Sequence, residues 1–347
     1  MKSALPSRLK QSVSALIISL AVAAPQAQAE EVLKFFNWSD YIAEDTIERF
    51  EKETGIKVIA DVFDSNEVLE AKMLAGSSGY DLVVPTSSFM GRQILAGVFQ
   101  PLDKAQLPNS KHLDPELLAY LEKVDPGNRY GIPYLWGTTG IGYNPEMVKK
   151  ALGENAPVDS WDLVFKPENM KKLTECGVMF LDSPDELYPL ALNYLKLDPN
   201  SKKKADYASK SPASKLLKSV RPYVSQFHSS QYINALANGD ICVAIGWSGD
   251  IIQAQDRAEE ADNGVEIIYS IPKEGTQIWF DMLAIPASAD NVENAHAFIN
   301  FLLRPDVIAD ITNYVAYANP NMAATALQDQ DISSNPGIFP SAEVKKR

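Results

Sequence analysis

The first third of the chain alternates short apolar runs with amphipathic stretches. Residues 32–38, 56–63 and 81–85 are rich in β-branched and aromatic side chains, which predicts three strands. Apolar positions near helical spacing predict helices at residues 42–54 and 65–74, and a third helix ends at Gly97. Strands that alternate with helices in such short units indicate a mostly parallel sheet flanked by helices.

The same pattern begins again after residue 140. The tetrapeptide Gly137-Thr138-Thr139-Gly140 has turn composition, and residues 141–144 start a new apolar stretch. Further on we predict helices at 229–238, 251–261 and 292–303, and strands at 241–247 and 277–286. These elements predict an α/β fold of two lobes, with a hinge where the chain crosses near residues 137–142 and 270–280. Lobe one is expected to hold residues 30–138 and 276–318, and lobe two residues 139–275. A cleft between two such lobes is where a ligand is expected.

Length and composition agree with two lobes. A chain of 347 residues is longer than one hydrophobic core usually organises. With 46% hydrophobic and 22% charged residues, it has the composition of an ordinary globular protein. Its net charge of −13 argues against nucleic acid as a partner, because an acidic surface releases no counterions from a phosphate backbone. The same charge weakly favours cationic ligands.

The N-terminus reads as a secretory signal peptide over residues 1–29. Lys2, Arg8 and Lys10 form a basic start, residues 15–24 are apolar, and Ala27 and Ala29 supply small residues at the cleavage positions. Residue 30 is not a cysteine, so no lipid attachment is expected there. No later stretch reaches the roughly 20 apolar residues of a membrane span. We therefore expect an exported protein, located in the periplasm and not inserted in the membrane.

Two cysteines, Cys176 and Cys242, are present. In an oxidising compartment two lone cysteines favour one disulfide, although a catalytic thiol or a metal pair is the alternative. The three histidines are scattered without a partner at helical spacing, so the sequence supports neither a metal site nor a cofactor.

Four acidic residues stand beside aromatic residues or near the ends of predicted strands: Asp40, Glu186, Asp250 and Asp281. Loops at the carboxyl ends of strands line the binding crevice of α/β proteins. A carboxylate next to an aromatic ring suits a primary ammonium, because the carboxylate supplies charge and the ring face attracts the cation.

Each of these acids has a purely structural alternative. Asp40 could favour the start of the helix at residue 42, and Asp250 could be the N-cap before residue 251. Glu186 follows Ser183 by three residues and would complete a capping box, which the sequence alone favours. Asp281 interrupts an apolar run, where an unpaired charge is costly, so a counter-charge or a ligand is favoured there.

Five motifs, taken in order along the chain, are informative together. They are Asn37-Trp38-Ser39-Asp40-Tyr41-Ile42, Asp61-Val62-Phe63-Asp64-Ser65-Asn66-Glu67, Thr138-Thr139-Gly140-Ile141-Gly142-Tyr143-Asn144, Phe227-His228-Ser229-Ser230-Gln231-Tyr232-Ile233-Asn234 and Ala237-Asn238-Gly239-Asp240-Ile241-Cys242. Together they resemble one family, the periplasmic putrescine-binding components of polyamine ABC transporters. The resemblance implies a type II periplasmic binding fold that closes on a polyamine, putrescine first and spermidine second, and delivers it to an inner-membrane ABC permease. It also implies a monomer that has no catalytic activity and no cofactor.

Carried over by position, the resemblance implies a ligand-binding set: Trp38, Ser39, Asp40, Tyr41, Thr86, Glu186, Ser229, Trp247, Asp250, Trp279, Asp281 and Tyr317. The four acids would anchor ammonium groups, and the aromatic residues would enclose the carbon chain. The family also pairs the cysteines that match Cys176 and Cys242. Trp279 stands where putrescine-selective relatives tend to have Phe, and relatives continue beyond the end of this chain, so residues 319–347 are expected to be a shortened C-terminal segment.

Two other classes compete with this interpretation. Paired carboxylates and tryptophans in a cleft also describe glycoside hydrolases and sugar-binding proteins. An amino-acid-binding protein would need a clamp for the ligand's carboxylate, usually an arginine, and no arginine lies beside these motifs in the sequence.

Overall fold

The computed structural model describes residue 1 and residues 31–346. Apart from Met1, the predicted signal peptide lies outside the described residues. Within the part that is described, no helix has the length and apolar character needed to cross a membrane.

The described residues contain nine strands, joined through one long central strand. The order is β2-β1-β3-β9-β4-β7-β5-β6, and β8 pairs with β4. The strands are β1 (Val32–Trp38), β2 (Lys57–Phe63), β3 (Leu82–Val83), β4 (Gly131–Tyr143), β5 (Val178–Phe180), β6 (Gln226–Phe227), β7 (Val243–Trp247), β8 (Ile268–Ser270) and β9 (Ile278–Ala284).

Each half of the strand order has three parallel strands, as the alternating pattern predicts. Strand β1 pairs in parallel with β2 and β3, and β5 pairs in parallel with β6 and β7. The strands that connect the halves are antiparallel, because β4 pairs with β7, β8 and β9 in opposite directions. The two-lobed α/β architecture is therefore confirmed.

Strand β4 passes from one lobe to the other and corrects one prediction. The tetrapeptide of residues 137–140 is not a turn: Gly137 pairs with Trp279 of β9, and Gly140 pairs with Gly246 of β7. Its glycines serve close packing, since a Cβ on Gly137 would lie 2.8 Å from the Trp279 ring. The return crossing runs through β8 and β9, in the region of residues 270–280 that the sequence predicts.

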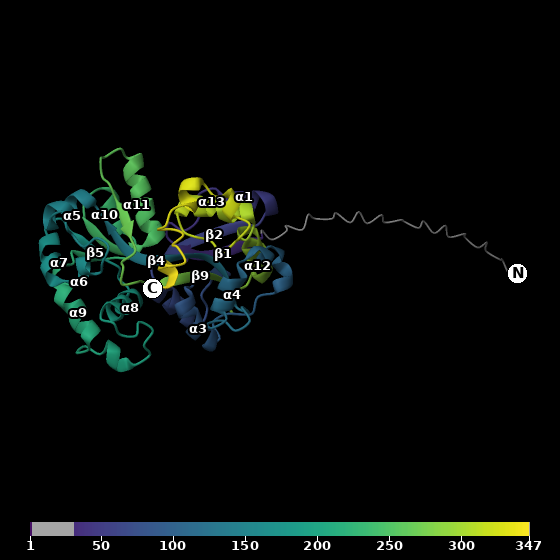
Figure 1. Cartoon of the computed structure of the whole chain (residues 1–347). Helices are drawn as coiled ribbons and strands as arrows, with labels where there is room; N and C mark the ends of the chain where they lie inside the picture. The colour runs from purple at the N-terminus through teal and green to yellow at the C-terminus, as the bar shows by residue number, and fades with distance from the viewer. Residues whose placement is uncertain (2–30, 347) are drawn as a thin grey trace. The chain divides into compact units, whose positions relative to one another are not determined.

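Helices cover both groups of strands (Figure 1). Around the first group lie α1 (Thr46–Thr54), α2 (Asn66–Leu74), α3 (Ser87–Leu95), α4 (Pro115–Leu121), α12 (Val292–Leu302) and α13 (Pro305–Val315). Around the second lie α5 (Pro145–Leu152), α6 (Asp162–Phe165), α7 (Pro167–Leu173), α8 (Pro184–Tyr194), α9 (Pro212–Val220), α10 (Tyr232–Ala237) and α11 (Ser248–Glu260). Helix α14 (Gln330–Ser333) lies in the C-terminal segment. Six short 3-10 helices complete the described elements: Lys104–Gln106, Pro108–His112, Lys204–Tyr207, Arg221–Tyr223, Thr325–Leu327 and Val344–Lys346.

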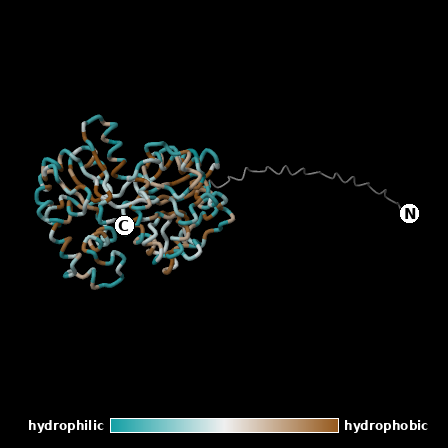
Figure 2. Tube along the Cα trace, viewed as in Figure 1, coloured by the Kyte–Doolittle hydropathy of each residue, from teal (hydrophilic) through white to brown (hydrophobic). Residues whose placement is uncertain are grey.

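Two separate hydrophobic cores correspond to the two lobes. The first is built from buried residues between Leu33 and Leu135 and between Trp279 and Ala324. The second is built from residues between Ile141 and Ile267. Hydrophilic residues follow the outer loops of each lobe, while hydrophobic segments lie inside (Figure 2). The exact lobe boundaries stay a prediction.

Three helices begin at different residues from those predicted, and one of them, α10, begins at Tyr232 and not at residue 229. Helix α1 starts at Thr46 and not at Ile42, because residues 39–45 form a loop in which the Tyr41 carbonyl accepts hydrogen bonds from the side chains of Asn37 and Tyr134. Helix α11 starts at Ser248, three residues earlier than predicted. Asp250 is therefore the third residue of a helix and not its N-cap.

Cys176 and Cys242 form a disulfide within lobe two, with a Cα–Cα distance of 5.4 Å. Cys176 follows α7 and Cys242 precedes β7, and the two are 66 positions apart in the sequence. This confirms the pairing that the sequence favours over a catalytic thiol or a metal ligand.

Replacing both cysteines with serine is expected to lower the free energy of unfolding by about 4 kcal/mol, because a cross-link across such a loop restricts the unfolded chain. Urea denaturation of the oxidised protein and of the double variant measures the difference. Dithiothreitol should lower the stability of the wild type and leave the double variant unchanged; equal stability of the oxidised wild type and the variant would contradict the prediction.

Candidate functional site

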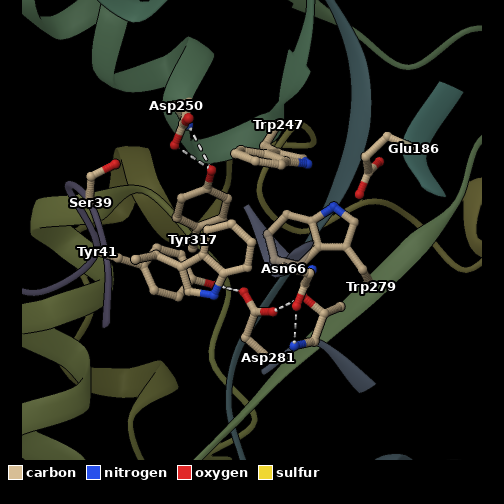
Figure 3. Close-up of a pocket in the computed structure, with 11 residues that line it drawn as sticks. Ser39, Tyr41, Asn66, Glu186, Trp247, Asp250, Trp279, Asp281 and Tyr317 are labelled. Carbon is tan, nitrogen blue, oxygen red and sulfur yellow. Dashed lines mark hydrogen bonds between the residues drawn. The ribbon is translucent and has the colours of Figure 1, made fainter. Parts of the chain in front are cut away.

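A pocket of about 390 Å³, which includes solvent at its mouth, opens between the lobes. Lobe one contributes the loops that follow β1, β2 and β3 together with β9, since the carboxyl ends of parallel strands meet at one edge of a sheet. Lobe two contributes the start of α8 and the β7–α11 junction. The residues that line the pocket are Trp38, Ser39, Tyr41, Asn66, Thr86, Glu186, Trp247, Asp250, Trp279, Asp281 and Tyr317 (Figure 3).

Asp281 lies on β9 and is held by two hydroxyl groups of lobe one. Tyr41 donates to its Oδ2 at 2.8 Å and Thr86 donates to its Oδ1 at 2.6 Å. The residue is only 3% exposed. Burial raises the pKa of Asp281 to about 7, because the charged form loses its hydration, and the two hydroxyl donors offset only part of this effect.

Asp250, in the first turn of α11, is held by two tyrosines. Tyr232 of α10 donates to Oδ2 at 2.6 Å, and Tyr317 donates to Oδ1 at 2.5 Å. Tyr317 belongs to the core of lobe one, so this hydrogen bond joins the two lobes. Burial again raises the pKa of the carboxyl group, to about 7.

Glu186, in the first turn of α8, is turned into the pocket. Its Oε2 accepts hydrogen bonds from Thr139 at 2.6 Å and from Gln277, both on the segments that cross between the lobes. The predicted capping box is wrong: the Ser183 hydroxyl caps no backbone N–H and donates to Glu67 of lobe one instead. Although Glu186 is partly open to the pocket, the surrounding protein raises its pKa to about 7 through desolvation.

Aromatic rings from both lobes form the walls between these acids. Trp38 and Trp247 meet across the lobes with ring centroids 5.5 Å apart. Tyr317 contacts Trp279 at 5.4 Å and Tyr41 at 4.9 Å. Such walls present ring faces, which attract cations and pack against methylene groups.

The charge balance of the pocket defines what it can hold. Among the described lining residues there are three carboxyl groups and no lysine, arginine or histidine. When ionised, a carboxylate can only accept hydrogen bonds, and a buried charge without a partner is unfavourable. The pocket therefore suits a slender cationic ligand with donors at more than one position.

The structure places Asp40 differently from the other three acids. Its carboxylate is absent from the pocket lining and forms an ion pair with Arg257 of α11 at 2.7 Å. Arg257 lies seven residues beyond Asp250 on α11, and only the folded chain brings it beside Asp40, so no sequence motif indicates this arginine. Asp40 thus joins the lobes at the rim and is not one of the carboxylates inside the pocket.

Ser229 is also outside the pocket. Its buried hydroxyl accepts a hydrogen bond from the backbone N–H of Asp182 at 3.2 Å, which fixes the loop between β5 and α8. The other ten residues of the predicted set all line the pocket. Their assignment as ligand contacts remains a prediction.

Asn66 lines the pocket, and the sequence analysis did not single it out. It is the first residue of α2, directly after the N-cap Ser65. Because β2 is parallel to β1, and β1 is parallel to β3, their carboxyl ends lie at one edge of the sheet. The parallel pattern alone could therefore have placed Asn66 at the same edge as Trp38 and Thr86.

Two lobes joined by crossing strands, with a ligand-sized pocket between them, define the class of two-lobed solute-binding proteins. Comparison with known families agrees: residues 45–340 match the bacterial extracellular solute-binding proteins, and the chain belongs to this family.

Three relatives show how specific the similarity is. The chain is 60% identical to the putrescine-binding periplasmic protein PotF of Escherichia coli (strain K12), over 92% of this chain and 86% of the relative. It is 57% identical to the putrescine-binding periplasmic protein SpuD of Pseudomonas aeruginosa (strain UCBPP-PA14), over 98% and 92%. Among solved structures, the spermidine/putrescine ABC transporter substrate-binding protein PotD of Streptococcus pneumoniae superposes with a TM-score of 0.71 at 29% identity, covering 91% of each chain.

The raised pKa values predict how the stability of the protein without ligand depends on pH. Asp250, Asp281 and Glu186 bind protons more tightly in the folded state than in the unfolded state, so their contribution to stability is complete below about pH 4 and is lost as the pH rises to about 7. Each group can contribute a slope of up to about 1.4 kcal/mol per pH unit in this window.

Urea denaturation at a series of pH values should therefore show a shallower loss of stability in Asp250→Asn and Asp281→Asn than in the wild type. Asp240→Asn removes the same charge from an exposed position and is the matched control. If both pocket variants kept the slope of the wild type and of the control, the carboxyl groups would not have the raised pKa values described above.

Proposed function

We propose that this chain is a periplasmic solute-binding protein that captures a short polyamine between its lobes, putrescine first and spermidine second. One observation carries the proposal: two buried carboxyl groups, Asp250 and Asp281, and the partly buried Glu186 lie between aromatic walls without a basic residue in the pocket lining. The names of the relatives, which are putrescine-binding or spermidine/putrescine-binding proteins, support the same ligand class.

In this proposal the two ammonium ends of a diamine pair with carboxylates of different lobes. Asp281 would hold one end in lobe one, and Asp250 and Glu186 would offer acceptors in lobe two. The proposed contact residues are the ten predicted ones that line the pocket: Trp38, Ser39, Tyr41, Thr86, Glu186, Trp247, Asp250, Trp279, Asp281 and Tyr317. Since each lobe would supply part of the counter-charge, the ligand would favour the closed arrangement of the lobes.

Simple magnitudes support a dication over a monoamine. One charge pair at about 4 Å contributes roughly 4 kcal/mol at an effective dielectric constant of 20. Micromolar affinity requires about 8 kcal/mol. Two paired ends and the ring faces can supply this after the costs of immobilisation, whereas a monoamine would lose one pair.

The remaining parts of the proposal concern where the protein acts and with what. We infer export to the periplasm through the signal peptide of residues 1–29, action as a monomer, and delivery of the ligand to an inner-membrane ABC permease. We propose no catalytic step, no cofactor and no metal. Glycoside hydrolysis or sugar binding by the same carboxylates and tryptophans is the competing function that the experiment below separates from this one.

Calorimetric titration of the exported form with putrescine, spermidine, cadaverine and a neutral oligosaccharide tests the proposal. We expect tight binding of at least one polyamine, and affinity that rises between about pH 6 and pH 8 as the carboxyl groups ionise. Asp250→Asn and Asp281→Asn should weaken binding by about 100-fold or more, because each removes one charge pair.

Asp240→Asn, which changes the same charge on the exposed surface, should bind polyamines like the wild type. Tight binding of the oligosaccharide, or turnover of a glycoside, with no response to any amine would overturn the proposal in favour of the competing function.

A further inference from the structure

We propose that Asn66 is a positioning residue for the polyamine site, which directs the hydroxyl proton of Thr86 onto Asp281 and so keeps Asp281 an acceptor for the ligand's ammonium. The inference rests on the proposed function and adds a residue that does not need to contact the ligand itself. Three hydrogen bonds carry it: two join Asn66 and Thr86 in opposite directions, and one runs from the Thr86 hydroxyl to Asp281.

The three residues come from the starts of two helices and from the middle of a strand in lobe one. Asn66 begins α2, Thr86 is the N-cap of α3, and Asp281 lies on β9. The Thr86 N–H donates to Asn66 Oδ1 at 3.1 Å, Asn66 Nδ2 donates to Thr86 Oγ1 at 2.8 Å, and Thr86 Oγ1 donates to Asp281 Oδ1 at 2.6 Å. Thr86 also forms a backbone bridge to Asp281, which fixes its distance from β9.

The direction of each hydrogen bond follows from the chemistry of its groups. A backbone N–H can only donate, so the amide oxygen of Asn66 must face the Thr86 backbone and its NH₂ group must face the Thr86 hydroxyl. That NH₂ group can only donate as well. The Thr86 hydroxyl is therefore the acceptor of this bond, and its single proton is left for Asp281.

This polarity favours one protonation state of Asp281. A hydroxyl forced to donate to Oδ1 stabilises the carboxylate and opposes a proton on that oxygen. The other titratable groups that face Asp281 are Tyr41 in the loop after β1, Tyr134 on β4 and Glu186 on α8. Tyr134 donates its proton to the Tyr41 carbonyl and not to Asp281. Tyr41 donates to Asp281 Oδ2, but no second hydrogen bond of fixed polarity orients its hydroxyl as Asn66 orients that of Thr86. Glu186 adds negative charge that disfavours ionisation of Asp281.

A double-mutant cycle on putrescine affinity tests this relay, using Asn66→Ala, Thr86→Val and the combination of both. We expect Asn66→Ala to weaken binding about fivefold to tenfold, the effect of one hydrogen bond. Thr86→Val should weaken it more, because it removes a hydrogen bond to a charged group. In the Thr86→Val protein, the additional Asn66→Ala change should weaken putrescine binding by less than twofold.

The pH profile gives a second measurement that a purely structural role would not change. Asn66→Ala should move the midpoint of the rise in putrescine affinity to higher pH, because the Asp281 carboxylate loses an oriented donor. Thr86→Ser keeps the hydroxyl and should keep both the wild-type midpoint and the full effect of Asn66→Ala. These two variants test the relay even if Thr86→Val fails to fold.

Ser65→Ala is the matched control. Ser65 caps the same helix by accepting from the Val68 N–H at 3.3 Å, so its loss weakens the start of α2 without touching the relay. It should lower the melting temperature and leave the pH midpoint unchanged. The proposed relay would be refuted if Asn66→Ala weakened putrescine binding equally with and without the Thr86 hydroxyl. It would also be refuted if Asn66→Ala left the midpoint of the pH profile unchanged. A wild type that binds no polyamine would instead refute the proposed function.

Discussion

The enclosure of three carboxyl groups, two of them buried, in a pocket without a basic residue is the constraint on which the rest of this structure depends. The protein surrounds them with hydroxyl, amide and indole groups, which can donate hydrogen bonds but supply no positive charge. An ionised carboxylate in such surroundings is unfavourable until a cation arrives. Ligand binding and ionisation of the carboxyl groups are therefore linked. A cationic ligand neutralises carboxylates that the protein itself leaves without a counter-charge, and this contributes to the binding free energy.

The crossing strands explain how this charge requirement acts on two lobes at once. Asp281 lies on β9, which pairs with β4 in lobe one, whereas Asp250 follows β7, which pairs with the other half of β4. Glu186 accepts from Thr139 and Gln277, on the two segments that pass between the lobes. A rigid movement of one lobe thus changes the distances among the carboxyl groups, so closure and capture of a dication depend on the same geometry.

The sequence predicted the features that depend on local pattern and missed those that depend on tertiary proximity. Strand β1 is predicted to the residue, and Asp281 stands out because a charge interrupts an apolar run. The turn predicted for the Gly137–Gly140 tetrapeptide is wrong because the same residues suit a turn and the close packing of a strand against its neighbouring strands and α11. The ion pair of Asp40 could not be predicted either, because its partner Arg257 lies 217 positions away and meets it only in the folded protein.

The aromatic walls have a role distinct from that of the hydrogen-bond donors. The Trp279 N–H is buried and has no partner in the described structure. An ammonium group carries no acceptor, so a polyamine cannot satisfy this N–H. Trp279 can therefore serve a cation only through its ring face, next to Tyr317. Recognition in this pocket would then divide between carboxylates, which fix the charged ends, and ring faces, which cover the methylene chain and set its available length.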